Sequence, residues 1–515
     1  MSYRFDQKIG KHVYVYEVES YWDKEKKQAR QKRVYVGKRN LKTNQIIPAK
    51  KKDQLGLIKD FGDVYFVEQA IKMSGVLDAI EGAFSKDDAE IIKQLCIYKI
   101  TESEPFYLYD SWIDGVQIEA AHKLSSQRIS EFTSRLGSND VGREEFFLLW
   151  SVMNTNVSSF FYDITSFSSY SKSIDLVEWG YNRDKEKLPQ INFGVAMGLP
   201  SGLPIFYETY PGSIKDVSTI KNILKRIEAY GFTKIKFILD KGFFSGPNIE
   251  SILEEKCDFV IPIPFTLNIA EELIVETLET LPSPSNLLYF KEGQALFCQK
   301  KKIVIKKHTV YAHIYLDEKR KAGEIENFAK AMNEVEFKFS KEKITTLKEA
   351  KIFSKEHCSG KKNIFNFSRK NNKITISRNN AESNKVIAKM GKIILITTGQ
   401  DMSEDELMYL YRKKDDIEKC FDDLKNELED NRLGASNNDS LRGRMFISFI
   451  SLIVYTFITN KMKEQDLFKK FTIKKILSEL RKIKHVEMIN GKKIISEITK
   501  TQRDIFDAFK ITIPW

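Results

Sequence analysis

Five runs rich in β-branched and aromatic residues, spread between residues 157 and 264, constrain the fold of this chain most. The runs are VSSFFYDITSF, INFGVAMGL, LPIFYETYPG, TKIKFILDKG and CDFVIPIP. A helix-patterned segment, DVSTIKNILKRIEAYG, separates the third run from the fourth, and PNIESILEEK separates the fourth from the fifth. Three successive strands followed by alternating helix and strand predict an α/β domain with a mixed sheet and flanking helices.

The length of 515 residues exceeds what one hydrophobic core usually supports, so we expect several domains. The sequence texture predicts six regions: a basic β-hairpin region (1–60), a helical domain (61–150), the first part of the α/β core (151–265), a Lys-rich and β-rich insertion (266–395), the second part of the core (396–465) and a basic helical C-terminal region (466–515). The insertion is inferred because the α/β core would otherwise lack its closing helix.

Basic residues gather at both ends of the chain. Lys plus Arg exceeds Asp plus Glu by 83 − 71 = 12, and residues 1–60 alone hold 16 basic against 7 acidic residues. Such an excess suits a polyanionic partner. Within this region, HVYVYEVESYW and KRVYVGK flank a polar turn, which predicts a hairpin with a basic tip and aromatic faces. A ribbon of this kind can lie along DNA or form a small solvated sheet, and both interpretations stay open.

The five cysteines are scattered singly without a CxxC pair, which indicates a reducing compartment and neither a disulfide framework nor a zinc site. The start of the chain, MSYRFDQKIG, does not have the apolar core of a signal peptide. The longest apolar run, Met445–Ile458, is too short to span a bilayer comfortably and predicts a buried helix. We therefore expect a soluble cytoplasmic protein with no membrane partner.

Two strands carry acidic residues at positions that favour chemistry. Asp163 lies within the otherwise apolar run FFYDITSF, where a carboxylate is costly unless it is paired or bound to a metal. Asp240 ends the strand IKFILD, and open α/β sheets place their sites at the carboxyl ends of strands. An Asp at a strand end can instead cap the following turn, so the sequence leaves this alternative for Asp240 open.

A third acid lies on the helix predicted over residues 411–428. At 3.6 residues per turn, Tyr411, Lys414, Glu418 and Lys425 would share one narrow face, beside a buried row of Ile417, Phe421, Leu424 and Leu428. Glu418 could then reach a polar cleft with basic groups beside it. A solvated helix flank with ordinary charge pairs four residues apart is the plainer alternative.

Together, Asp163, Asp240 and Glu418 form a candidate three-acid site. Oxygen ligands of this kind suit Mg²⁺ or Mn²⁺. Two such ions roughly 3.5–4 Å apart can activate a hydroxyl and stabilise the leaving oxygen in phosphodiester transfer. Lys414, Lys425 and Tyr411 would hold backbone phosphates nearby. The chain contains no GxxxxGK[ST] loop, which argues against an ATP-driven role.

With these residues in place, the chain resembles DDE transposases of bacterial insertion sequences, in the branch with a Tyr-x2-Arg-x3-Glu-x6-Lys signature. Three blocks match in order: YDITSF around Asp163, LDKGF around Asp240, and the series from Tyr411 to Lys425. The segments LPQINFGVAMGLPSGLPIFYETYPGS and LRGRMFISFISL are also similar to family segments. The chain departs from the signature at Lys414, where Arg is expected; Lys keeps the charge but lacks the planar fork that binds a phosphate through two hydrogen bonds.

The resemblance implies a ribonuclease-H-like catalytic core interrupted by a β-rich insertion, with Asp163, Asp240 and Glu418 as metal ligands. Tyr411, Lys414 and Lys425 would contact DNA. Family members bind the terminal inverted repeats of their element as dimers, cut DNA with water and join the 3′ hydroxyl to target DNA in the bacterial cytoplasm. The alternatives are a divalent-metal nuclease without strand transfer and a DNA-binding protein whose catalytic centre has decayed.

Overall fold

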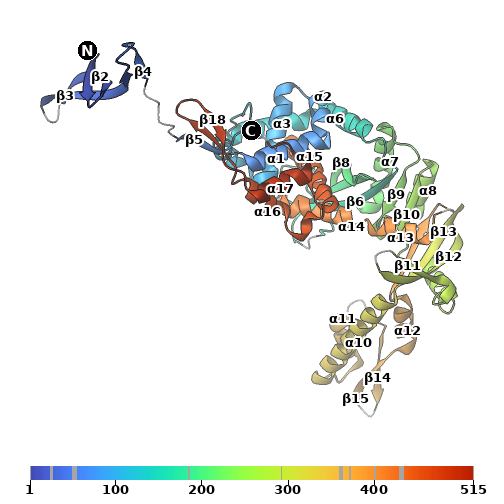
Figure 1. Cartoon of the computed structure of the whole chain (residues 1–515). Helices are drawn as coiled ribbons and strands as arrows, with labels where there is room; N and C mark the ends of the chain where they lie inside the picture. Colours follow the sequence, from blue (N-terminus) through green and yellow to red (C-terminus); the bar gives the residue numbers. More distant parts are fainter. Residues whose placement is uncertain are drawn as a thin grey trace. The chain divides into compact units, whose positions relative to one another are not determined.

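The computed structural model describes residues 2–23, 27–48, 55–183, 186–290, 293–358, 363–370, 373–399, 402–428 and 434–513. Its internal contacts divide the chain into two compact units. The terminal unit consists of Met1–Phe66, Ile113–Ala121 and Lys474–Trp515, and the central unit consists of Val67–Trp112 and His122–Ile473. Figure 1 follows the chain through both units.

The central unit is built on a nine-stranded mixed sheet in the order β11-β12-β13-β16-β10-β9-β6-β7-β8. Its strands are β6 (Ser159–Ser168), β7 (Gln190–Leu199), β8 (Leu203–Pro211), β9 (Lys236–Leu239), β10 (Asp258–Pro262), β11 (Leu287–Phe290), β12 (Gln294–Ile305), β13 (His308–Leu316) and β16 (Lys392–Thr397). β9 runs parallel to both β6 and β10, and the other neighbours are antiparallel. The predicted mixed sheet is confirmed.

Two helices connect the strands around β9, as the sequence predicts. α7 (Ile220–Ala229) leads into β9, and α8 (Gly246–Glu254) leads from it towards β10. α7 buries Ile220, Ile223, Leu224 and Ile227, the spacing of one helix face. The start of α8 is capped by the Ser245 side chain, which accepts a hydrogen bond from the Asn248 N–H.

A long apolar helix, α15 (Asn438–Glu464), forms the core of the helical part of the central unit. The other helices of this part are α2 (Val76–Ala83), α3 (Lys86–Glu102), α5 (Ser126–Ser138) and α6 (Asp140–Met153). α15 is long and apolar enough to cross a membrane, but 83% of its most apolar window is buried within the protein. The ring of Phe446 packs edge-on against those of Phe84 and Phe146. The predicted buried helix is confirmed.

α5 and α15 approach each other through two glycines. A Cβ added to Gly443 would fall on the carbonyl oxygen of Thr133, and one added to Gly137 would fall on that of Asp439. The backbones therefore touch at a distance that only residues without a side chain allow.

We predict that Gly443→Ala destabilises the protein, because the methyl group must push α5 away from α15. The expected cost is about 1–3 kcal/mol, the range for overpacked interiors. The measurement is the thermal melting temperature. Gly323→Ala is the matched control, since no atom lies within 4 Å of its added Cβ and alanine favours the helix. Equal melting temperatures for Gly443→Ala and the wild type would contradict the prediction.

The segment 266–395 differs from the expected β-rich insertion. β11, β12 and β13 extend the central sheet, and the rest of the segment is mostly helical. Its further elements are α9 (Asn268–Thr277), α10 (Glu318–Lys341), α11 (Leu347–His357), β14 (Phe365–Lys370), β15 (Lys373–Arg378) and α12 (Asn380–Lys389). Phe328, Met332 and Val335 of α10 are buried in a small hydrophobic core formed by this segment. That spacing is helical, and the abundant lysines hid it in the sequence.

The terminal unit contains the predicted N-terminal hairpin and a second small sheet. The strands β1 (Ser2–Ile9), β2 (His12–Asp23), β3 (Gln28–Arg39) and β4 (Ile46–Pro48) form one antiparallel sheet, and β5 (Leu55–Asp60), β17 (Lys484–Met488) and β18 (Lys493–Ile495) form the other. Its helical segments include parts of α1 (Gly62–Ser74), α4 (Tyr109–Gly115) and α16 (Ile473–Leu480), and all of α17 (Lys500–Phe509). The C-terminal region was expected to be helical, but β17 pairs with β5, so strands interrupt it.

Candidate active site

Asp163 and Asp240 lie on neighbouring parallel strands at the same level. β6 and β9 pair in register, with Tyr162 opposite Leu239. The residue after each of these two is an acid, so the backbones of Asp163 and Asp240 lie roughly one strand spacing, 4.7–4.9 Å, apart. Asp240 directly follows β9 and precedes the short helical turn η3 (Lys241–Phe243). The structure therefore brings together two acids that are far apart in the sequence.

The third acid, Glu418, lies on an interrupted helix and not on the single helix expected over residues 411–428. α13 (Glu404–Arg412) ends in a turn, α14 (Asp415–Asp422) comes next, and the π-helical segment η5 (Asp423–Glu427) completes the series. At the turn, the N–H groups of Lys414 and Ile417 bond to carbonyls three residues back, which tightens the backbone. The expected apolar row, made of Ile417, Phe421, Leu424 and Leu428, is buried.

Contacts at the end of η5 hold this helical series in place. The Lys99 ammonium donates to the Leu428 carbonyl at 2.9 Å, and the Ser103 hydroxyl donates to the Glu427 carbonyl. The Tyr455 hydroxyl of α15 donates to the Glu427 side chain at 3.3 Å. The bonds from Lys99 and Ser103 satisfy carbonyl groups that helix ends otherwise leave without partners.

Lys414 joins the acids electrostatically. Its Nζ lies 3.1 Å from Asp240 Oδ1 and 3.0 Å from Glu418 Oε1, and its side chain is only 13% exposed. Asp163 also attracts this charge. The three predicted acids therefore gather around one ammonium group.

Burial and charge change the pKa values of this group. Burial raises the pKa of Asp163 to about 6, although the Ile164 N–H and Lys414 favour its ionised form. Burial also disfavours the charge of Lys414, but the attraction of Asp240, Glu418 and Asp163 is larger and raises its pKa. For Tyr411, burial is the main cause that raises the pKa to about 12. At neutral pH, Lys414 is therefore charged and Tyr411 keeps its proton.

Lys425, the last basic residue predicted for this face, lies in the π-helical segment and not on a regular helix. It lies in η5, is 8% exposed, and places its ammonium 5.9 Å from the ring centroid of Phe167 on β6. The turn at Lys413 and Lys414 and the wider π-helical segment change the angular spacing that a regular helix would have. Arg412 points elsewhere, as expected, and its guanidinium lies over the ring of Phe290.

Arg183 is a neighbour of the site that the sequence did not reveal. Its charge favours the ionised form of Asp163, and its guanidinium donates to the Ser166 hydroxyl at 3.0 Å and pairs with Asp216. Arg183 lies between β6 and β7 in a segment without a recognisable pattern. Only the folding of that segment over the sheet identifies it.

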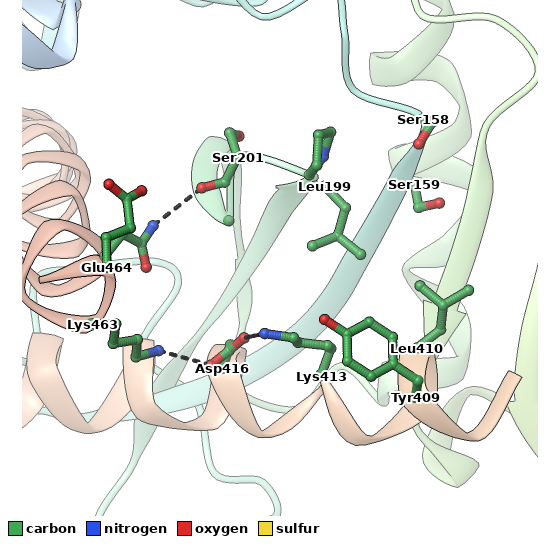
Figure 2. Close-up of a pocket in the computed structure, with 13 residues that line it drawn as sticks. Ser158, Ser159, Leu199, Ser201, Tyr409, Leu410, Lys413, Asp416, Lys463 and Glu464 are labelled. Carbon is green, nitrogen blue, oxygen red and sulfur yellow. Dashed lines mark hydrogen bonds and ion pairs between the residues drawn. The ribbon is translucent and has the colours of Figure 1, made fainter. Parts of the chain in front are cut away.

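A cavity of about 460 Å³ lies beside the turn between α13 and α14. Its lining includes the start of β6 and residues of α13, α14 and α15. Figure 2 shows Asp416 between Lys413 and Lys463, which lie 3.6 and 3.0 Å from its carboxylate oxygens. The two adjacent lysines of the turn thus pair with different acids: Lys414 with the three-acid site and Lys413 with Asp416.

Within the described ranges, no group of three His, Cys, Asp or Glu side chains lies close enough to hold a metal ion as it stands. The acids are instead arranged around the Lys414 ammonium. Their oxygen atoms are nevertheless the donors that Mg²⁺ and Mn²⁺ prefer, and their surroundings favour a positive charge.

Comparison with known proteins identifies the family. The family model described as "Transposase DDE domain" matches residues 160–454, which is more than half of the chain and includes Asp163, Asp240 and Glu418. The chain therefore belongs to this transposase family. No curated protein matches it.

Among solved structures, the chain is similar to the piggyBac transposase in its synaptic complex with hairpin DNA. The identity is 10%, the TM-score is 0.37, and the match covers 82% of this chain and 79% of the other. Similarity at this level establishes neither a shared fold nor a shared activity.

We predict that Asp163→Asn stabilises the protein at pH 7.5. The pKa of Asp163 is about 6 in the folded protein, above its usual value of 3.8. Between pH 3.8 and pH 6 the folded protein therefore holds a proton that the unfolded chain has lost, and the free energy of unfolding falls as the pH rises through this range. The gain from Asn is at most about 3 kcal/mol, because Asp163 is partly exposed, and it should shrink towards pH 4.

Thermal melting at several pH values checks this prediction. Asp415→Asn, which removes an exposed acid of α14, is the control for the loss of one carboxylate. A melting temperature of Asp163→Asn equal to or below that of the wild type at pH 7.5 would show that the carboxylate is not a destabilising group.

Proposed function

We propose that the chain is an active transposase of a bacterial insertion sequence, in the branch with the Tyr-x2-Arg-x3-Glu-x6-Lys signature. It binds the terminal inverted repeats of its element, cuts the DNA by hydrolysis and joins the 3′ hydroxyl ends to target DNA. The observation that carries the proposal is the convergence of Asp163, Asp240 and Glu418 around one cation, within a chain of the DDE family.

The catalytic core is proposed to be ribonuclease-H-like. Support comes from strand order: three antiparallel strands, β8, β7 and β6, continue into β9 and β10, which run parallel to β6. Helices α7 and α8 connect this second part, and the first two acids lie side by side on β6 and at the end of β9. An acid pair at the carboxyl end of β9 is where an open α/β sheet places its site.

Asp163, Asp240 and Glu418 would hold Mg²⁺ or Mn²⁺, as two ions. When bound, such ions supply an activated hydroxyl and stabilise the leaving oxygen. The protein's own groups bind the substrate: Lys414 offers a compact positive charge to a phosphate, and Tyr411, which keeps its proton, can donate a hydrogen bond. Lys425 is the last residue of the signature. In this proposal its ammonium moves away from the Phe167 ring to contact DNA.

The N-terminal sheet β1–β4 is proposed to bind DNA. One of its faces carries Tyr3, Phe5 and Tyr35, all more than a third exposed, with the Arg33 guanidinium 5.2 Å from the Phe5 ring centroid. Aromatic rings and cations on one exposed surface can contact both bases and phosphates. The +9 charge of residues 1–60 supports the same role.

Joining two element ends requires two active sites, so we include a homodimer on DNA in this proposal. A cytoplasmic, nucleoid-associated location also belongs to it. All five cysteines are free and buried, which suits a reducing compartment.

Two other functions compete with this proposal. A metal nuclease would use the same acids without strand transfer. A catalytically inactive DNA-binding protein is favoured by one observation, the position of the Lys414 ammonium between Asp240 and Glu418. Divalent-metal-dependent cutting of terminal repeats excludes the inactive protein, and covalent joining of the cut ends to target DNA excludes the simple nuclease.

We predict that replacing Asp163, Asp240 or Glu418 singly by Ala lowers the rate of strand cleavage at least about 1000-fold. Each variant loses a carboxylate that would hold the metal ions, and those ions would stabilise the charge of the transition state. Binding to terminal DNA should change less than about threefold. Cleavage and gel-shift assays on the same DNA measure the two effects. Asp415→Ala, on the same helix as Glu418, should cut normally, and a triad variant that cuts at the wild-type rate would remove its residue from the site.

We also predict that removing residues 1–48 weakens DNA binding and flattens its dependence on salt, because the cations of β1–β4 release counterions when they bind phosphates. This deletion retains β5, which pairs with β17. As a point test, Arg33→Ala, which removes a cation of the aromatic face, should lower the slope of log affinity against log salt by about one, and Gln31→Ala on the same face should not. Unchanged slopes would show that this sheet does not contact phosphates.

A further inference from the structure

Lys414 lies where a metal ion bound to the three-acid site would be expected. Its ammonium is within hydrogen-bonding distance of Asp240 Oδ1 and Glu418 Oε1, at 3.1 and 3.0 Å. Asp163 attracts the same charge from the neighbouring strand. The Lys414 side chain is only 13% exposed, so its ammonium takes much of its stabilisation from these acids and little from water.

A metal ion and this ammonium would compete for the same oxygen atoms. A Mg²⁺ ion lies roughly 2.0–2.1 Å from each carboxylate oxygen that binds it. An ammonium that stays about 3 Å from those oxygens would lie within a few ångströms of the ion, and two cations so close repel strongly in a partly buried pocket. Metal binding to Asp240 and Glu418 therefore requires Lys414 to move away.

The position of Lys414 in the chain permits this movement. It lies in the turn between α13 and α14, and the ion pairs that its side chain forms within the described structure are those with Asp240 and Glu418. A lysine carries its charge on a flexible four-carbon stem, whereas the planar fork of the Arg expected from the family signature fits two acceptors at once. Lys is thus the better residue for a cation that changes partners.

We propose that Lys414 is the internal counter-ion of the three-acid site: it binds Asp240 and Glu418 in the metal-free protein and is displaced when a divalent ion binds. The three acids stay together without a metal because the ammonium offsets their repulsion. The displaced ammonium is then beside the site, where it can bind a DNA phosphate. This inference rests on the proposed function, since it takes the acids to be metal ligands.

The test measures Mn²⁺ binding to the full-length, DNA-free protein, with the free ion counted by electron paramagnetic resonance. Lys414→Met removes the charge and keeps most of the side-chain volume. It should bind Mn²⁺ at least about tenfold more tightly than the wild type, because no cation has to be displaced. Its metal-free melting temperature should be lower, and Mn²⁺ should raise that temperature more than it does for the wild type.

Two variants serve as controls. Lys413→Met removes the adjacent lysine of the same turn, which pairs with Asp416, so its Mn²⁺ affinity should stay within about threefold of the wild type. Lys414→Arg retains the charge and can bind two acceptors at once, so it should bind Mn²⁺ no more tightly than the wild type. If Lys414→Met folds poorly by circular dichroism, Lys414→Gln replaces it.

The outcomes separate this inference from the proposed function. If the wild type binds Mn²⁺ and Lys414→Met binds it no more tightly, Lys414 is not a competing counter-ion, although the acids can still form the metal site. If neither protein binds Mn²⁺, and removing Lys414 leaves the metal-free melting temperature unchanged, the counter-ion role and the three-acid metal site both fail.

Discussion

The central constraint on this structure is the repulsion among carboxylates that share one partly buried place. Asp163 and Asp240 are neighbours on parallel strands, and Glu418 approaches them from a helix. Like charges that lie close together disfavour one another, and the burial of Asp163 adds to the cost of its charge. The Lys414 ammonium offsets this repulsion. The site is therefore an ion cluster whose arrangement depends on a cation, which is supplied by the protein itself when no metal ion is bound.

The surrounding fold keeps this cluster in position by rigid packing. β6 is buried along almost its whole length, with Asp163 as its partly exposed residue. The series of α13, α14 and η5 is anchored by its buried apolar row and by hydrogen bonds from Lys99 and Tyr455. The turn at Lys413 and Lys414 interrupts the helix, and these two adjacent lysines pair with different acids. A tightly packed scaffold with one irregular turn is an arrangement often found where proteins hold charged groups for chemistry.

Local patterns in the sequence predicted the parts of the fold that depend on short-range periodicity. The strands of the core, α7, α8 and the buried helix α15 each followed from apolar spacing. The helix α10 was missed because lysines and glutamates interrupt its apolar row, although Phe328, Met332 and Val335 have helical spacing. The strand character of β17 was also missed, since its pairing partner, β5, lies more than 400 residues earlier in the chain. Pairing over such a distance leaves no local signal.

The sequence by itself determined the family of this chain and made Asp163, Asp240 and Glu418 the candidate acids, because the motif blocks around them are local and ordered. Only the tertiary structure decided what those acids contact. The register of β6 with β9 sets the first two side by side, the broken helix brings Lys414 between the second and third, and the segment after β6 adds Arg183. These contacts depend on strand register and on a turn within a helix, and neither can be derived from the spacing of residues along one element.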